Sequence, residues 1–146
     1  MKRIMMMLLA LLTASLPAWA ALGEYESSVT LDQKYIAGVD RQQVRHGYRL
    51  HEITASDGSV VREYVAPSGI VFGVSWQGHA VPNLQQLLGS HMTDLQQGQR
   101  RVVPRRSLVV TSGDFVFFSI GHLRMFQGHA FVPSLIPGGL GPEVVQ

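Results

Sequence analysis

The clearest pattern in the chain is an alternation of apolar and polar residues in its middle third. In residues 70–77 the large apolar residues fall on every second position, which is typical of a strand with one buried face. Two other runs rich in β-formers precede it at 48–54 and 59–65. Ser56-Asp57-Gly58 and Pro67-Ser68-Gly69 separate the three runs, and both supply a glycine for a tight turn. These runs therefore predict an antiparallel meander.

A stripe of apolar residues at helical spacing follows the meander. Pro82 is suited to the first turn of a helix and Gly98 to its end. The stripe consists of Leu84, Leu87, Leu88, Met92 and Leu95. One amphipathic helix is therefore predicted, with its apolar side against the sheet.

The two segments before the meander carry weaker signals. Ser27 or Ser28 can cap a short helix that runs through Tyr35 and Ile36 and stops at Gly38. Residues 39–46 are mostly polar and predict a connector.

A second β region is predicted after the helix. Its strands are expected at Ser107–Thr111 and Phe115–Ile120, and then at Leu123–Phe126 and Ala130–Val132 on either side of a turn at Gln127-Gly128. The glycine-rich stretch 133–142 predicts irregular structure. The fold class is thus α+β, with a meander, one helix and further antiparallel strands. The alternative is a small β-sandwich with a helix.

The first twenty residues have the order of a cleavable signal peptide. Lys2 and Arg3 precede nine apolar residues, and Ala18-Trp19-Ala20 matches a cleavage site. The apolar run is too short to cross a membrane. We expect cleavage between Ala20 and Ala21, one globular domain over 21–146, and a periplasmic or extracellular location with no transmembrane segment after cleavage. The alternative is a buried first helix of the fold.

Charge and cysteine content narrow the function classes. The whole chain has a net charge of +2, but the leader carries two basic residues and no acidic one, so 10 basic and 10 acidic residues remain. This balance gives no support to a nucleic-acid partner. Because the chain has no cysteine, it can form neither disulfides nor cysteine-ligated zinc sites.

No complete catalytic motif is present in the sequence. Gly73-Val74-Ser75-Trp76-Gln77 lacks the last glycine of a nucleophile elbow and lies in a predicted strand, which favours a structural serine. The six histidines do not have metal-ligand spacing within one element, although a site assembled from distant segments, for example His51, His79 and His91, stays open. We expect no cofactor and no metal.

Three groups of residues are candidates for binding. Arg62 and Tyr64 flank Glu63 in the middle strand, where Arg62 could serve a polar site or pair with Glu52 across the strands. Trp76 and His79 could form a ligand-facing edge, although Trp76 could equally be a core residue. A basic loop could hold phosphate or an anionic lipid head group, or be simply solvated; it contains Arg100, Arg101, Arg105 and Arg106.

These observations favour a non-catalytic exported domain that binds a protein or a cell-envelope component. The alternative is a small hydrolase or metal-dependent enzyme that uses the histidines with Glu52 or Glu63. Docking to the envelope through the arginine loop is a third possibility.

Several blocks of the chain resemble one exported bacterial family. They include residues 58–78, with Val-Arg-Glu-Tyr-Val-Ala-Pro-Ser-Gly at their centre, together with 48–53, 82–89, 21–23 and 124–137. The family is called domain of unknown function 2844, and the chain departs from it at 96–104 and 115–118. The resemblance implies a secretory protein of a Gram-negative bacterium, and it implies no reaction or ligand.

Overall fold

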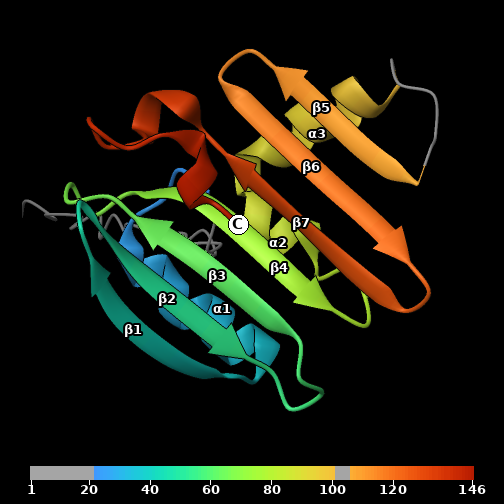
Figure 1. Cartoon of the computed structure of the whole chain (residues 1–146), viewed down its shortest axis with the longest axis horizontal. Helices are drawn as coiled ribbons and strands as arrows, with labels where there is room; N and C mark the ends of the chain where they lie inside the picture. Colours follow the sequence, from blue (N-terminus) through green and yellow to red (C-terminus); the bar gives the residue numbers. More distant parts are fainter. Residues whose placement is uncertain (1–21, 101–105) are drawn as a thin grey trace, which may run out of the picture.

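The computed structural model describes residues 22–100 and 106–146. Its seven strands form one antiparallel sheet in the order β1-β2-β3-β4-β7-β6-β5, so the fold is mixed α+β (Figure 1). The strands are β1 (Val39–Arg45), β2 (Tyr48–Thr54), β3 (Val60–Val65), β4 (Val71–Gly78), β5 (Ser107–Ser112), β6 (Phe115–His122) and β7 (Met125–Phe131). The helices are α1 (Val29–Ile36), α2 (Leu84–Leu88) and α3 (Met92–Gln99), and short 3₁₀ turns are η1 (Glu26–Ser28), η2 (Gly89–His91), η3 (Pro133–Leu135) and η4 (Pro142–Val144).

The predicted meander is confirmed as β2, β3 and β4. Its two tight turns place Gly58 at φ 82° and Gly69 at φ 85°, a conformation that favours glycine. The second β region does not form a sheet of its own. It joins the first because β7 pairs with β4, from Gly73 opposite Phe131 to Gly78 opposite Phe126. The sandwich alternative is therefore wrong.

The connector predicted at 39–46 is wrong, because most of it is the edge strand β1. All seven residues of β1 pair with β2. None of them is buried, and Val39 and Val44 are 74% and 82% exposed. Because no side chain of this strand is buried, the sequence shows no alternation of apolar and polar positions that could predict it.

The single helix predicted from Pro82 to Gly98 is divided in two. Asn83 caps α2 by accepting a hydrogen bond from the backbone N–H of Gln86 at 3.2 Å. Gly89, at φ 51° and ψ −121°, then ends α2 and redirects the chain through η2 into α3. The apolar stripe survives the break, since Leu87, Leu88 and Leu95 are all buried.

The predicted turn at Gln127-Gly128 is also wrong, because both residues lie inside β7. The turn comes earlier, at Leu123 and Arg124, which both have positive φ. A Cβ at Gly128 would lie 2.4 Å from Cζ2 of Trp76, so this glycine makes room for the indole ring.

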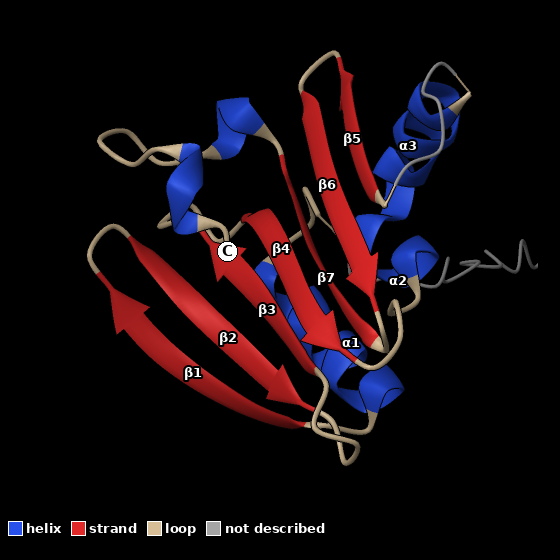
Figure 2. Ribbon diagram, turned by 45° about the vertical axis from the view of Figure 1, so that its right-hand side comes forward, coloured by secondary structure: helices blue, strands red, loops and turns tan. Residues whose placement is uncertain are grey.

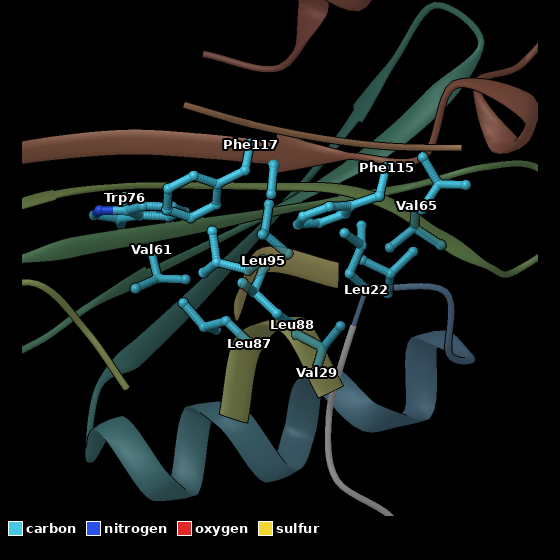
Figure 3. Close-up of a cluster of buried hydrophobic side chains, with 14 of the residues drawn as sticks. Leu22, Val29, Val61, Val65, Trp76, Leu87, Leu88, Leu95, Phe115 and Phe117 are labelled. Atoms are coloured by element: carbon cyan, nitrogen blue, oxygen red, sulfur yellow. The ribbon is translucent and has the colours of Figure 1, made fainter. Parts of the chain in front are cut away.

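The sheet has two differently covered faces. In Figure 1 the helices lie behind the sheet, and the chain after β7 crosses in front of it; Figure 2 shows the same division from another side. The back face forms the main core, with large side chains from the strands meeting the helices (Figure 3). The segment 132–146 covers one end of the front face and buries a second cluster that includes Leu50, Tyr64, Phe72 and Val145.

Candidate functional site

Two adjoining hollows lie on the part of the front face that the segment 132–146 leaves uncovered. The first has a volume of about 550 Å³ and is lined by Arg62, Trp76, Gln77, Phe118, Gln127, Gly128, His129 and Gln146. The second, of about 490 Å³, shares Phe118 and His129 with the first and extends to Val109 and Pro142. We call this region, centred on Arg62, Gln77, Phe118, Gln127 and His129, the open face.

A row of stacked rings forms the floor of the open face. Phe118 of β6 pairs with His129 of β7 in the strand register, and their rings stack with centroids 5.2 Å apart at 28°. His129 in turn stacks on Phe131 with a centroid distance of 6.2 Å. Burial lowers the pKa of His129 below its ordinary value, so this ring is uncharged at neutral pH. The floor is therefore flat, aromatic and neutral.

Arg62 lies at one border of the open face. Its Nε donates to Oε2 of Glu52 at 2.8 Å, which is the cross-strand ion pair considered from the sequence. Gln77 and Gln127 lie opposite each other on β4 and β7, and both are exposed. The border therefore offers amide and guanidinium donors around the aromatic floor.

Tyr64 is buried and serves a different purpose from Arg62. Its hydroxyl donates to the main-chain oxygen of Gln146 at 2.7 Å and accepts from the Gln146 N–H at 3.1 Å. The hydroxyl of Ser75 donates to the same Gln146 oxygen at 2.6 Å. Tyr64 and Ser75 therefore anchor the segment 132–146 to the sheet.

The structure does not bring the other predicted binding residues to the open face as a group. Trp76 borders the first hollow, but its indole lies in the core on the back face, with its ring centroid 5.6 Å from that of Phe117. His79 is exposed, and its Nδ1 lies 3.2 Å from the main-chain oxygen of Arg124. Arg100 follows α3 and Arg106 precedes β5, and both are exposed. The predictions for Arg101 and Arg105, like that of the signal peptide, concern residues outside those that the structure describes.

Glu63 points to the back face and is almost completely buried, at 1% exposure. Neither of its oxygens has a hydrogen-bond partner in the described part of the chain. Burial raises the pKa of Glu63 well above its usual range, and the neighbouring carboxyl of Asp32 raises it further. Burial also raises the pKa of Asp32, whose Oδ1 accepts from Nε2 of Gln86 at 2.8 Å. The surroundings of Glu63 therefore favour its protonated form.

A second polar group ties η1 to the first two strands. His51 lies 2.8 Å from Oδ2 of Asp40 through Nδ1 and 3.0 Å from Oε1 of Glu26 through Nε2. Hydrogen bonds from Arg49 lower the pKa of Glu26 to about 2. Every member of this group has an internal partner, so its role is structural.

The histidines considered for a metal site have separate surroundings. His51 is held by carboxylates as above, His79 lies at the end of β4, and His91 stacks on Phe115 with a centroid distance of 5.2 Å. Within 22–100 and 106–146, no group of three or more histidine, aspartate or glutamate side chains is arranged to hold a metal ion. Over the same ranges no helix has the length and apolarity needed to cross a membrane.

Phe118 and Gln127 were not among the residues singled out from the sequence, and His129 was noted only as one of six histidines. These residues become a site because β7 lies between β4 and β6. The predicted strand at 115–120 includes Phe118, but the sequence could not indicate which strands would be its neighbours.

These features define a class of protein: a mixed α+β domain with one antiparallel sheet, helices on one face and a partly open second face. The chain belongs to the family described as Protein of unknown function (DUF2844), whose model matches residues 18–145. Searches of curated proteins and of solved structures found no match.

Proposed function

We propose that this protein is an exported, non-catalytic domain that binds a component of the cell envelope through its open face. The order of charged, apolar and small residues in the first twenty positions supports export to the periplasm or beyond. The absence of cysteine is compatible with folding outside the cytoplasm, where free thiols are oxidised.

The observation that carries the binding role is the aromatic floor of the open face. A sheet face that serves only to meet water normally carries polar residues. Here Phe118 and His129 stack in an uncovered hollow, and Val109 next to it is 54% exposed. Uncovered apolar surface with a polar border is typical of binding sites.

The chemistry of the open face favours a glycan as the ligand. Sugar rings present C–H faces that pack on aromatic rings, whose faces are electron-rich. Their hydroxyl groups can bond to the amides of Gln77 and Gln127 and to Arg62. Because His129 is neutral and Arg62 is already paired with Glu52, these two residues give the open face no strong attraction for an anionic ligand.

The nearby polar groups are engaged in structure rather than poised for a reaction. Ser75 lies opposite His129 on the neighbouring strand, but its hydroxyl donates to Gln146. Glu52 is paired with Arg62, and Glu63 lies on the other side of the sheet beside Asp32. These contacts favour a binding role over the hydrolase alternative.

Co-sedimentation with purified bacterial sacculi tests this function. We expect the wild-type protein to sediment with the sacculi, and Phe118→Ala to bind roughly three- to tenfold more weakly because a ring contact is lost. Gln127→Ala should weaken binding as well, whereas the control Gln96→Ala, on the exposed side of α3, should not.

Two results would contradict the proposal. The first is a wild-type protein that stays in solution with sacculi in excess. The second is binding that depends on Arg100 and Arg106 rather than on Phe118 and Gln127, which would favour docking through the arginine loop. Export is tested separately by the mass of the native protein, which should correspond to a chain that begins at Ala21.

A further inference from the structure

The sheet ends at β5, and the outer edge of this strand is unpaired in the described part of the chain. β5 is the last strand in the order β1-β2-β3-β4-β7-β6-β5, and it pairs with β6 alone among the described strands. Figure 1 shows β5 at one border of the sheet, with α3 behind it. Unpaired backbone N–H and C=O groups at such a border are a template for a further strand.

β5 lacks the features that usually protect an edge strand from pairing. It includes neither a charged residue nor a proline, and its pairing with β6 runs without a shift in register. Val109, near its middle, is 54% exposed. The opposite edge strand, β1, carries Asp40, Arg41 and Arg45 instead. Because charges, prolines and bulges are what keeps edges apart, β5 is the edge that is open to a partner.

The direction of the free backbone groups follows from the pairing of β5 with β6. The N–H of Gly121 donates to the main-chain oxygen of Arg106 at 3.3 Å, so these opposed residues form a hydrogen-bonded pair. Bonded and non-bonded pairs alternate along an antiparallel ladder. The N–H and C=O groups of Ser107, Val109 and Thr111 therefore point away from β6, toward the open edge.

These outward-pointing residues match a second copy of β5 that runs in the antiparallel direction. When Val109 lies opposite Val109 of the second copy, Ser107 lies opposite Thr111, and each of these pairs can exchange two backbone hydrogen bonds. The side chains of these residues are on the front of the sheet. On the back, Leu108 lies opposite Val110, so small and branched side chains meet on both faces and no charge is opposed by a like charge.

The charges just beyond the two ends of β5 are complementary. Arg106 precedes the strand, and Asp114 lies in the turn that follows it; both are exposed. Asp114 also accepts the N–H of Ser134 at 3.1 Å. The antiparallel register places Arg106 diagonally across from Asp114 of the second copy, a separation that a long side chain can bridge. Opposite charges at both ends favour a second copy over an unrelated strand as the partner.

We propose that two copies of this protein pair through β5 into a two-fold symmetric dimer with one continuous sheet. A two-fold axis perpendicular to the sheet uses the same edge of both copies and closes the assembly. The axis keeps both front faces on one side, so the hollow that Val109 lines in one copy adjoins the same hollow in the other. The pairing uses none of the five residues on which the open face is centred, so it does not rest on glycan binding.

Sedimentation velocity over a range of protein concentrations tests the pairing. One strand edge buries less surface than a standard interface of about 1,600 Å², so we expect a reversible dimer that forms between roughly 10 and 500 µM. The same measurement is made on variants of the two edge strands. Since all of them share the first twenty residues, any association through that segment is common to the set.

Val109→Pro is the most specific variant. It removes an N–H that points to the open edge and leaves the hydrogen bonds between β5 and β6 in place, so it should weaken association by roughly tenfold or more. Val44→Pro in β1 is the matched control, since Val44 is 82% exposed. Its N–H also points outward, because Arg45 and Tyr48 flank a two-residue turn and form a bonded pair. Val44→Pro should associate like the wild-type protein.

The absence of cysteine allows a second test with substitutions that disturb the strands less. Val109→Cys and Val44→Cys each introduce the single thiol of the chain. A short bismaleimide linker should join two copies of Val109→Cys but not two copies of Val44→Cys. Circular dichroism checks the fold of every variant. If Val109→Pro does not fold, Val109→Lys takes its place, because it sets two like charges opposite each other across the axis.

Any one of three results would overturn the proposal. A wild-type protein that stays monomeric at roughly 500 µM would show that the edge of β5 does not pair in solution. Equal association of the wild-type protein and a folded Val109→Pro or Val109→Lys variant would place the contact elsewhere. In a mixture of the two cysteine variants, preferential linkage of Val109→Cys to Val44→Cys would show that unlike edges pair.

Discussion

The surroundings of two glutamates shift their pKa values in opposite directions. Glu26 is bonded by Arg49 and has a pKa of about 2, whereas burial beside Asp32 raises the pKa of Glu63 well above its usual range. Glu26 stabilises the fold at pH values above its ordinary pKa of 4.5, and this stabilisation is lost as the pH falls toward 2. Glu63 contributes in the opposite sense, because folding favours its protonated form. Its effect on stability is most favourable below pH 4.5 and is lost as the pH rises through its folded pKa.

Glu63→Gln therefore should not destabilise the protein at neutral pH, because glutamine resembles the protonated acid. As the pH rises, the variant should become more stable than the wild-type protein, by about 1–3 kcal/mol once Glu63 would have to ionise in the fold. Urea unfolding at pH 5, 7 and 9 measures the difference.

The control for this prediction is Glu52→Gln, which removes a partly exposed acid on the front face. It should not reproduce the gain at high pH. If the free energies of unfolding of Glu63→Gln and of the wild-type protein changed with pH in the same way, this would show that Glu63 is ionised in the folded protein.

Gly128 is a second position at which a change of one residue should alter the stability of the protein. A Cβ at this position would lie 2.4 Å from Trp76 and 2.5 Å from the main-chain oxygen of Phe118. Gly128→Ala should therefore destabilise the protein by about 1–3 kcal/mol through overpacking and alter the fluorescence of Trp76. Gly138→Ala is the control, since a Cβ there has no neighbour within 4 Å among the described atoms. Equal stability of the two variants would contradict this account.

At the scale of elements, the sequence predicted the strands that are rich in β-formers and separated by turn residues. Strands β2, β3 and β4 are joined by turns that contain Gly58 and Gly69, and they were predicted within one residue. Strand β1 was missed because its side chains are largely exposed and backbone pairing to β2 holds it. The break at Gly89 was missed because the apolar stripe continues past it, and Gly128 was read as a turn glycine although it lies in a strand and makes room for a neighbouring ring.

The candidate site was less predictable than the strands. Arg62 was identified because it lies next to Glu63 in a strand, where one of the two charges must face covered surface. Phe118 and His129 could not be placed with Arg62, since the pairing of β4 with β7 joins segments about fifty residues apart in the chain. Such long-range pairing leaves no local pattern in the sequence.

The segment 132–146 is the element that decides how much of the front face is open. Tyr64 and Ser75 hold Gln146, and Val145 packs where a Cβ at Gly73 would come within 2.6 Å of its Cγ2. Tyr64→Phe removes two of these hydrogen bonds, so we expect faster amide exchange over 140–146 and a loss of about 1 kcal/mol in the free energy of unfolding.

Hydrogen exchange followed by mass spectrometry measures this release directly. Tyr48→Phe is the control, because Tyr48 belongs to the same aromatic cluster but its hydroxyl has no hydrogen bond to another described side chain. If Tyr64→Phe leaves exchange over 140–146 unchanged, the hydroxyl does not anchor this segment.

At the scale of the whole molecule, the sheet separates two chemical environments. Behind it, the helices bury the main core and the acid pair of Asp32 and Glu63. In front of it, the segment 132–146 covers one end and leaves the stacked rings of the open face. The back therefore maintains the fold, while the front presents a rigid surface built on five strands, β3 to β7.

The central claim is that the open face binds an envelope glycan, and mapping of backbone amide shifts by NMR tests it most directly. On addition of soluble peptidoglycan fragments, we predict saturable shifts confined to residues around Arg62, Gln77, Phe118, Gln127 and His129. Amides of α1 and α3, behind the sheet, should not move. Shifts centred on those helices, or no shifts at millimolar fragment concentration, would contradict the account.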